Sequence, residues 1–184
     1  MPGAAPARGA TPITRLGQLA ALWGLCGYTL LIVTAVLRLW PYVVELFAKS
    51  SLEIHHTVAL VAWVGFMLYS EAYRGFHLAF APRFAVRAAH LARQPTVLRA
   101  LLAPAFCMGL LFATRKRLIV SWLLVVAIVG LVLGVRMLAQ PWRGIVDVGV
   151  VLGLAAGSGS VLWFFGRALT GTAIPMAPDL PAGG

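Results

Sequence analysis

Ionisable side chains at the edges of long apolar segments are the residues of this chain best placed to do chemistry. Glu53 and His56 are three residues apart and share one helical face, while Arg143 and Asp147 are four apart and share another. Ionisable groups in or beside membrane spans are costly to keep there, which makes them candidates for function. Together with Arg136, these residues predict a polar pocket between helices. The alternative is that Arg143 and Asp147 form an ion pair that only neutralises both groups.

Metal binding and catalysis have less support in the sequence. Glu53 and His56 supply too few ligands for a metal site, and His55 points about 100° away from His56 around a helix. The sequence shows no Ser/His/Asp set, no glycine-rich phosphate loop and no carboxylate pair at catalytic spacing. We therefore expect a protein without catalytic machinery, and His56 is the one residue to test as a metal ligand.

Composition places the chain in a membrane. Hydrophobic residues make up 61% of the 184 positions, charged residues make up 11%, and the mean hydropathy is +0.91. The net charge of +10 would suggest nucleic acid in a soluble protein. Here the basic residues flank apolar segments, where they set orientation and meet anionic lipid headgroups, so we expect the lipid bilayer as partner and no nucleic acid.

Uncharged segments of roughly 20 residues, the length of a membrane span, predict an all-α polytopic membrane protein. Spans are expected at 16–39, 54–73, 118–137 and 145–165, inside one transmembrane domain over residues 15–170. Residues 1–14 and 171–184 are rich in Ala, Pro and Gly and are expected to be disordered ends.

The segment Ala100–Thr114 is apolar but short, and Pro104 interrupts it. It is expected either to dip into the membrane and return or to form a fifth apolar helix. The first option gives four spans and places both termini on the cytoplasmic side of a bacterial inner membrane, because basic residues are enriched in cytoplasmic loops. One face then collects most of the basic residues, namely Arg8, Arg15, Arg74, Arg83, Arg87, Arg93, Arg99, Arg115, Lys116, Arg117 and Arg167.

An amphipathic helix is expected from Pro82 onward. Arg83, Arg87 and His90 share one of its faces, and Phe84 and Leu91 share another. This pattern indicates a helix lying on the membrane surface, with the three basic residues in contact with anionic lipid. The alternative is a basic segment that only fixes the topology.

Glycines four residues apart mark two of the expected spans. Small residues at this interval let neighbouring backbones approach closely. The short link between these spans predicts that they pack antiparallel. The residues are Gly130 and Gly134 in the first span and Gly149, Gly153 and Gly157 in the second.

His56, Trp63, Gly65 and Tyr69 form the pattern His-x6-Trp-x-Gly-x3-Tyr. It resembles the first helix of membrane-bound protoporphyrinogen oxidases and of copper-resistance D-type domains. Arg99 with Pro104-Ala105 and Gly109 is similar to their second helix. The resemblance covers about residues 54–165 and implies that His56 is a haem or metal ligand, with Arg143 and Asp147 opening the last helix. The chain lacks the lysine that these families carry within the third helix, and it has an additional first span.

The sequence therefore predicts two alternative functions. The first is a non-enzymatic packing or accessory membrane protein, as a homo-oligomer or as a subunit of a larger complex. The alternative is a haem- or metal-handling membrane protein that uses His56.

Overall fold

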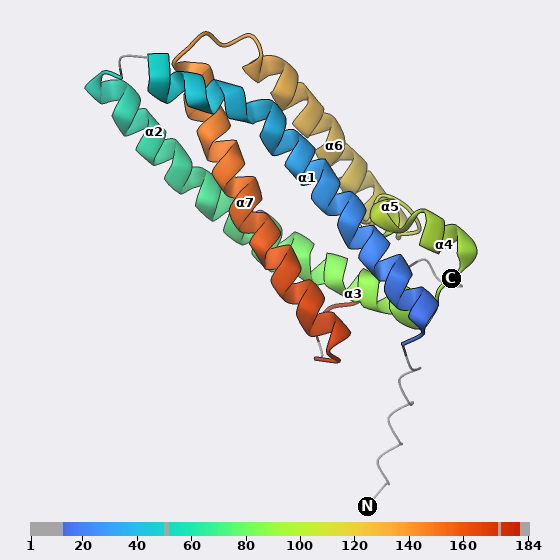
Figure 1. Ribbon diagram of the computed structural model, residues 1–184. Helices are drawn as coiled ribbons and strands as arrows, with labels where there is room; N and C mark the ends of the chain where they lie inside the picture. Colours follow the sequence, from blue (N-terminus) through green and yellow to red (C-terminus); the bar gives the residue numbers. More distant parts are fainter. Residues whose placement is uncertain (1–12, 50–51, 173, 181–184) are drawn as a thin grey trace, which may run out of the picture.

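Helices make up 81% of the computed structural model, and there is no strand among the residues that it describes, which are 13–49, 52–172 and 174–180. The chain begins with α1 (Arg15–Lys49), which leads into α2 (Ile54–Met67). The π-helix η1 (Leu68–Phe80) and then α3 (Ala81–Arg93) follow without a break. Two short helices, α4 (Val97–Leu101) and α5 (Ala103–Cys107), precede α6 (Arg115–Val135) and α7 (Trp142–Leu169) (Figure 1).

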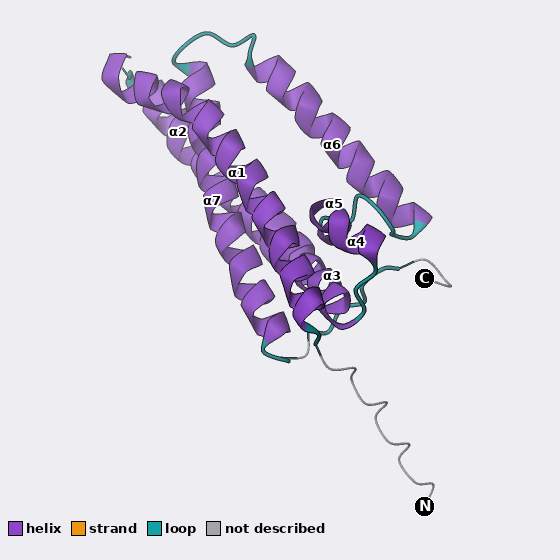
Figure 2. Cartoon of the chain, turned by 45° about the vertical axis from the view of Figure 1, so that its right-hand side comes forward, coloured by secondary structure: helices purple, strands orange, loops and turns teal. Residues whose placement is uncertain are grey.

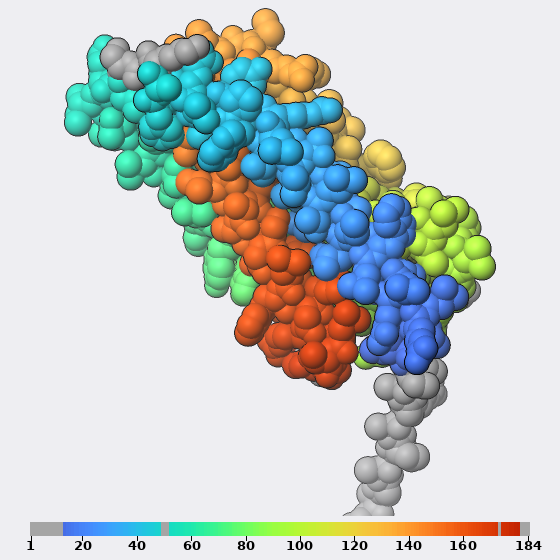
Figure 3. Space-filling model, in the orientation of Figure 1, coloured from blue at the N-terminus to red at the C-terminus, as the bar shows by residue number. Residues whose placement is uncertain are grey.

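Three helices in the described part of the chain are long and apolar enough to cross a membrane. They are α1 over Arg15–Ala48, α6 and α7. In Figure 3, α1 and α7 lie side by side across one face of the molecule. The expected fold class is confirmed at this level, as an all-helical protein with three candidate spans.

The helix 54–93 is continuous but changes direction where η1 meets α3 (Figure 1). Two features account for the bend. A π-helix is wider than an α-helix, and Pro82 lacks the N–H that would continue the hydrogen-bond ladder. As a result, α2 and η1 run along α7, whereas α3 passes beneath α1 and α7 at one end of the bundle.

The structure places α3 inside the protein, which corrects the expectation of a helix on the membrane surface. Phe84, Ala88, Leu91 and Ala92 on α3 are all 0% exposed. The apolar face of α3 packs against α1, α5 and α7, so protein rather than lipid covers it.

A stripe of small residues on α1, not among the expected packing faces, allows α1 to lie close to α3 and α5. A Cβ on Gly17 would lie 2.0 Å from the Ala92 carbonyl oxygen, and one on Gly24 would lie 2.8 Å from Cys107 Sγ. A Cβ on Gly27 would clash with the Pro104 ring. These glycines therefore let α3 and α5 approach the backbone of α1 more closely than any larger residue would allow.

The glycines of α7 face α2 and η1. A Cβ on Gly149 would lie 2.5 Å from the Trp63 ring, and one on Gly157 would lie 2.4 Å from the Phe76 ring. A Cβ on Gly153 would lie 2.8 Å from Oε2 of the Glu71 carboxylate.

By contrast, α6 lies apart from the bundle, and within the described residues it packs along no other helix (Figure 2). Ser121 is its only buried residue, and a Cβ on Gly130 or Gly134 would meet nothing within 4 Å. The expected antiparallel packing of α6 on α7 is therefore wrong within this chain. Trp63, Glu71 and Phe76 already occupy the glycine face of α7, and α1 packs against α7 as well.

The segment Ala100–Thr114 contains no long helix. The five-residue helices α4 and α5 pack against α1, and a turn over 108–113 leads into α6. Gly109 adopts a positive φ of 76° in this turn, a conformation that glycine reaches without steric cost.

The two expected flexible ends differ. Residues 1–12 lie outside the described part of the chain, but Thr14 is fixed by a hydrogen bond from its N–H to the Ala92 carbonyl, 3.2 Å long. In the C-terminal segment, residues 174–180 have no helix yet make specific contacts with α3 and the turn before α6.

Candidate functional site

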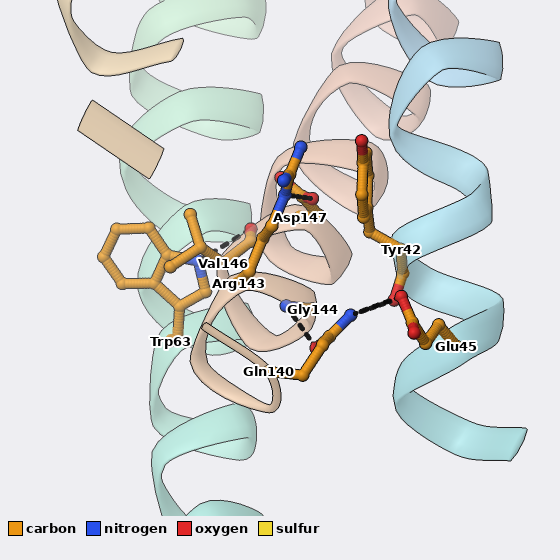
Figure 4. A network of polar contacts seen from close by, with 8 residues as sticks. All are labelled: Tyr42, Glu45, Trp63, Gln140, Arg143, Gly144, Val146 and Asp147. Atoms are coloured by element: carbon orange, nitrogen blue, oxygen red, sulfur yellow. Dashed lines mark hydrogen bonds and ion pairs between the residues drawn. The ribbon is translucent and has the colours of Figure 1, made fainter. Parts of the chain in front are cut away.

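A polar joint ties the start of α7 to the end of α1. The side chain of Gln140 bridges the two helices: its Oε1 accepts from the Gly144 N–H at 3.1 Å, and its Nε2 donates to the Tyr42 carbonyl at 3.2 Å. The same Nε2 also reaches the Glu45 carboxylate at 3.4 Å (Figure 4). Gln140 thus satisfies one of the free N–H groups that every helix start exposes, while holding α1 in place.

The Arg143 and Asp147 pair lies within this joint, one turn into α7. Arg143 Nε is 3.8 Å from Asp147 Oδ2, and the guanidinium carbon lies 3.4 Å from the centre of the Tyr42 ring. Asp147 is 2% exposed, and its Oδ2 has no hydrogen-bond partner among the described residues. The expected ion pair is therefore present, and the Tyr42 ring adds a cation–π contact that the sequence alone did not reveal.

Trp63 attaches α2 to the same region. Its indole N–H donates to the Val146 carbonyl at 3.1 Å (Figure 4). Its ring also covers Gly149. The start of α7 is therefore held by α1 on one side and by α2 on the other.

The expected pocket of five polar residues is not formed. Glu53 is exposed and lies 3.3 Å from His55 rather than against the Arg143 and Asp147 pair. Arg136, at the end of α6, is exposed because α6 lies apart from the bundle. Among the five, Arg143 contacts Asp147 and Glu53 contacts His56, so both contacts are between near neighbours at the start of one helix.

His56 caps the helix that it begins. Its Nδ1 accepts from the Glu53 N–H at 3.3 Å, which puts the ring proton on Nε2, and its ring meets the Trp142 ring edge-on at 5.2 Å. Neither nitrogen then has a free lone pair for a metal or haem iron. The described residues also contain no cluster of three or more His, Cys, Asp or Glu side chains able to hold a metal ion. His56 in this arrangement does not fit the ligand role that the family resemblance implies.

A second polar cluster lies at the opposite end of the bundle, and Arg87 on α3 is its centre. Arg87 is 3% exposed and stacks over the Phe106 ring at 4.3 Å. Its guanidinium donates hydrogen bonds of 2.6–3.1 Å to four backbone carbonyls, those of Phe106, Leu111, Phe112 and Pro178. The expected contact of Arg87 with lipid is therefore wrong, because the broken segment after α5 leaves carbonyls that Arg87 satisfies.

Arg83 and His90 flank Arg87 on the same face of α3. Arg83 Nε lies 3.8 Å from Asp179 Oδ2, and about a third of its side chain remains exposed. His90 is half-buried against the Phe106 ring. Burial lowers the pKa of His90, and the nearby Arg99, Arg87 and Arg93 lower it further, so its ring is neutral at pH 7. Of the three residues, only Arg83 retains the exposed charge that lipid contact requires.

The polar contacts between α1 and the start of α7 connect the two helices, so their expected effect is on stability. Replacing Arg143 with methionine should lower the free energy of unfolding by about 2 kcal/mol, because the buried Asp147 carboxylate loses its counter-charge. Adding Asp147→Asn should restore part of the lost stability, because it removes the unpaired charge of the Asp147 carboxylate. Denaturation of the single and double variants in detergent gives both values. A double variant as unstable as Arg143→Met would show that Asp147 carries no charge in the folded protein.

The fold and the two polar clusters define an all-helical protein of the membrane class, with three helices able to cross a bilayer and buried polar groups used for helix joints. Comparison with known proteins finds no family, no curated protein and no solved structure that matches this chain.

Proposed function

We propose that this protein is a non-enzymatic accessory subunit of a membrane assembly, and that α6 is the helix through which it contacts the rest of that assembly. One observation carries the proposal. α6 is an apolar helix of 21 residues that the described part of the chain leaves uncovered (Figure 2). Its Gly130 and Gly134 offer a flat surface to which another helix can pack closely, in the way that paired small residues do in membranes.

The polar contacts at both ends of the bundle support this role. Gln140, Trp63 and Arg87 use their polar atoms on backbone carbonyls and N–H groups of neighbouring helices. Polar groups engaged in this way stabilise the bundle and are not free to bind a substrate. In this role, the rigid bundle holds α6 where another subunit can pack against it.

We further propose four spans in a bacterial inner membrane, formed by α1, the continuous helix of α2 and η1, α6 and α7. Both termini would lie on the cytoplasmic side. The start of α1, all of α3 and the start of α6 lie at one end of the bundle, and most of the basic residues lie in or beside these segments.

This topology predicts the accessibility of position 116. Lys116→Cys, in a Cys26→Ala and Cys107→Ala background, should resist a membrane-impermeant maleimide added to intact cells and should react after the cells are opened. Position 116 is exposed at the start of α6, so protection would come from the membrane rather than from the fold. Ready labelling in intact cells would exclude the proposed orientation.

The role of α6 predicts the effect of Gly134→Leu. No described residue lies within 4 Å of a Cβ at position 134, so the variant should keep the stability of the parent. The assembly should nevertheless dissociate, because the leucine blocks close helix approach. Light scattering in mild detergent measures the mass of the particle, and Gly159→Leu, at an equally open position on α7, is the matched control. An unchanged mass for Gly134→Leu would show that this face of α6 holds no partner.

A further inference from the structure

Three arginines converge at the end of the bundle opposite the Gln140 joint. Arg83 and Arg87 come from α3 and Arg117 from α6, and all three line a small cavity with Asp179 of the C-terminal segment. We call this the basic pocket. The rest of its wall is formed by Phe80, Phe84, Cys107, Met108 and Gly109.

The charges in the basic pocket do not balance. Arg87 is largely occupied, because it donates to four backbone carbonyls, but its charge remains. Burial lowers the pKa of Arg87 only to about 10, so it is protonated at pH 7. Arg83 lies 3.8 Å from the Asp179 carboxylate, and Arg117 has no ion pair within 4 Å among the described residues. Three positive charges therefore face a single carboxylate.

Asp179 is held in the basic pocket by its backbone. Its carbonyl accepts from the Thr114 N–H at 3.0 Å, and the Pro178 carbonyl accepts from Arg87 at 2.8 Å. Asp179 has a positive φ of 51°, which is uncommon for a residue other than glycine. With Asp179 in place the cavity has a volume of about 10 Å³, which is room for one water molecule at most.

The basic pocket also lies where a lipid headgroup would be found. Arg117 is in the first turn of α6, a candidate membrane span, so the pocket opens near the point where α6 would enter the bilayer. Arg115 and Lys116, in the same turn, are exposed and add positive charge around the opening.

We propose that the basic pocket binds the phosphate group of an acidic phospholipid, and that Asp179 is an internal occupant that the phosphate displaces. The phosphate of phosphatidic acid is a monoester that brings up to two negative charges and several acceptor oxygens, whereas Asp179 brings one charge. Arg83 and Arg117 are the ligands, since their guanidinium groups can each donate two hydrogen bonds to phosphate oxygens. Arg87 positions the C-terminal segment and supplies charge without touching the ligand. This site is separate from the face of α6 that carries Gly130 and Gly134, and it does not depend on the proposed subunit role.

The test measures binding to the purified full chain in detergent. The probes are short-chain dihexanoyl phosphatidic acid, inorganic phosphate and the zwitterionic dihexanoyl phosphatidylcholine. Asp179→Asn should bind phosphatidic acid about tenfold more tightly than the parent, which corresponds to about 1.4 kcal/mol. Adding Arg83→Gln and Arg117→Gln to this variant should remove the gain. Glu53→Gln, which removes one negative charge at the far end of the molecule, should bind as the parent does.

The probes separate two sources of the same chemistry. Tighter binding of phosphatidic acid alone would identify a lipid headgroup, and tighter binding of inorganic phosphate as well would show that free phosphate can also occupy the basic pocket. Either result supports a phosphate site. Equal affinity of Asp179→Asn and the parent would overturn the proposal, and so would an equal gain for Glu53→Gln or for phosphatidylcholine. If Asp179→Asn disturbs the C-terminal segment, the double variant Arg83→Gln and Arg117→Gln in the parent still tests the site. This double variant should abolish the weaker binding of phosphatidic acid by the parent. Unchanged binding would contradict the proposal.

Discussion

Replacing Arg87 with methionine should lower the free energy of unfolding by about 3 kcal/mol or more, because buried carbonyls lose their donors and each unsatisfied group costs about 1–3 kcal/mol. Arg87 is 3% exposed and bonds to carbonyls of α5, of the turn before α6 and of the C-terminal segment. Methionine fills a similar length but donates no hydrogen bond. Chemical denaturation in detergent measures the difference.

Arg83→Met is the matched control for this variant. Arg83 lies about one turn earlier on the same helix, and its 3.8 Å contact with Asp179 is partly exposed. Exposed ion pairs of this kind contribute at most about 1 kcal/mol. Equal losses for Arg87→Met and Arg83→Met would show that the four carbonyl contacts of Arg87 do not stabilise the fold.

Gly17→Leu should lower the free energy of unfolding by about 2–3 kcal/mol, the upper part of the range for an overpacked core. Even the first side-chain carbon at position 17 would lie 2.0 Å from the Ala92 carbonyl oxygen, so α1 and α3 would have to separate. The contact is with backbone and not with the end of a side chain, which leaves little room for relief. Thermal unfolding in detergent gives the shift.

Gly159→Leu serves as the control for Gly17→Leu, since nothing lies within 4 Å of a Cβ at that position. It should match the parent or exceed it slightly, because leucine favours a helix more than glycine does. A parent-like stability for Gly17→Leu would mean that α3 does not pack against α1 at this point.

Features that depend on neighbours along one helix could be predicted from the sequence. Arg143 and Asp147 are four residues apart, and their pairing follows from helix geometry alone. The all-helical class follows in the same way from the length and composition of the apolar segments. The role of Gln140 was missed because its partner Tyr42 lies 98 positions earlier in the chain, although a lone amide in an apolar turn was a visible signal.

Features that depend on which helices meet could not be predicted. The sequence indicates that Arg83, Arg87 and His90 share a face, but not that Arg87 meets the free carbonyls of a broken segment. Similarly, glycine spacing indicates a helix face that another helix can approach closely, but it does not predict which helix packs there. Gly149, Gly153 and Gly157 face α2 and η1, whereas Gly130 and Gly134 face no part of the described chain. The small residues Gly17, Ala20, Ala21 and Gly24 on α1 were an equally visible signal.

The most direct test of the subunit role is photo-crosslinking along α6 in intact cells. A photoreactive residue is placed in turn at Gly130, Leu131 and Gly134, and at Gly159 on α7 as the control. We expect a discrete crosslinked protein at Gly130 and Gly134, and much less product at Leu131 and Gly159. The mass of the crosslinked product would identify either a second copy or another subunit. Crosslinks to lipid alone at every α6 position would contradict the subunit role.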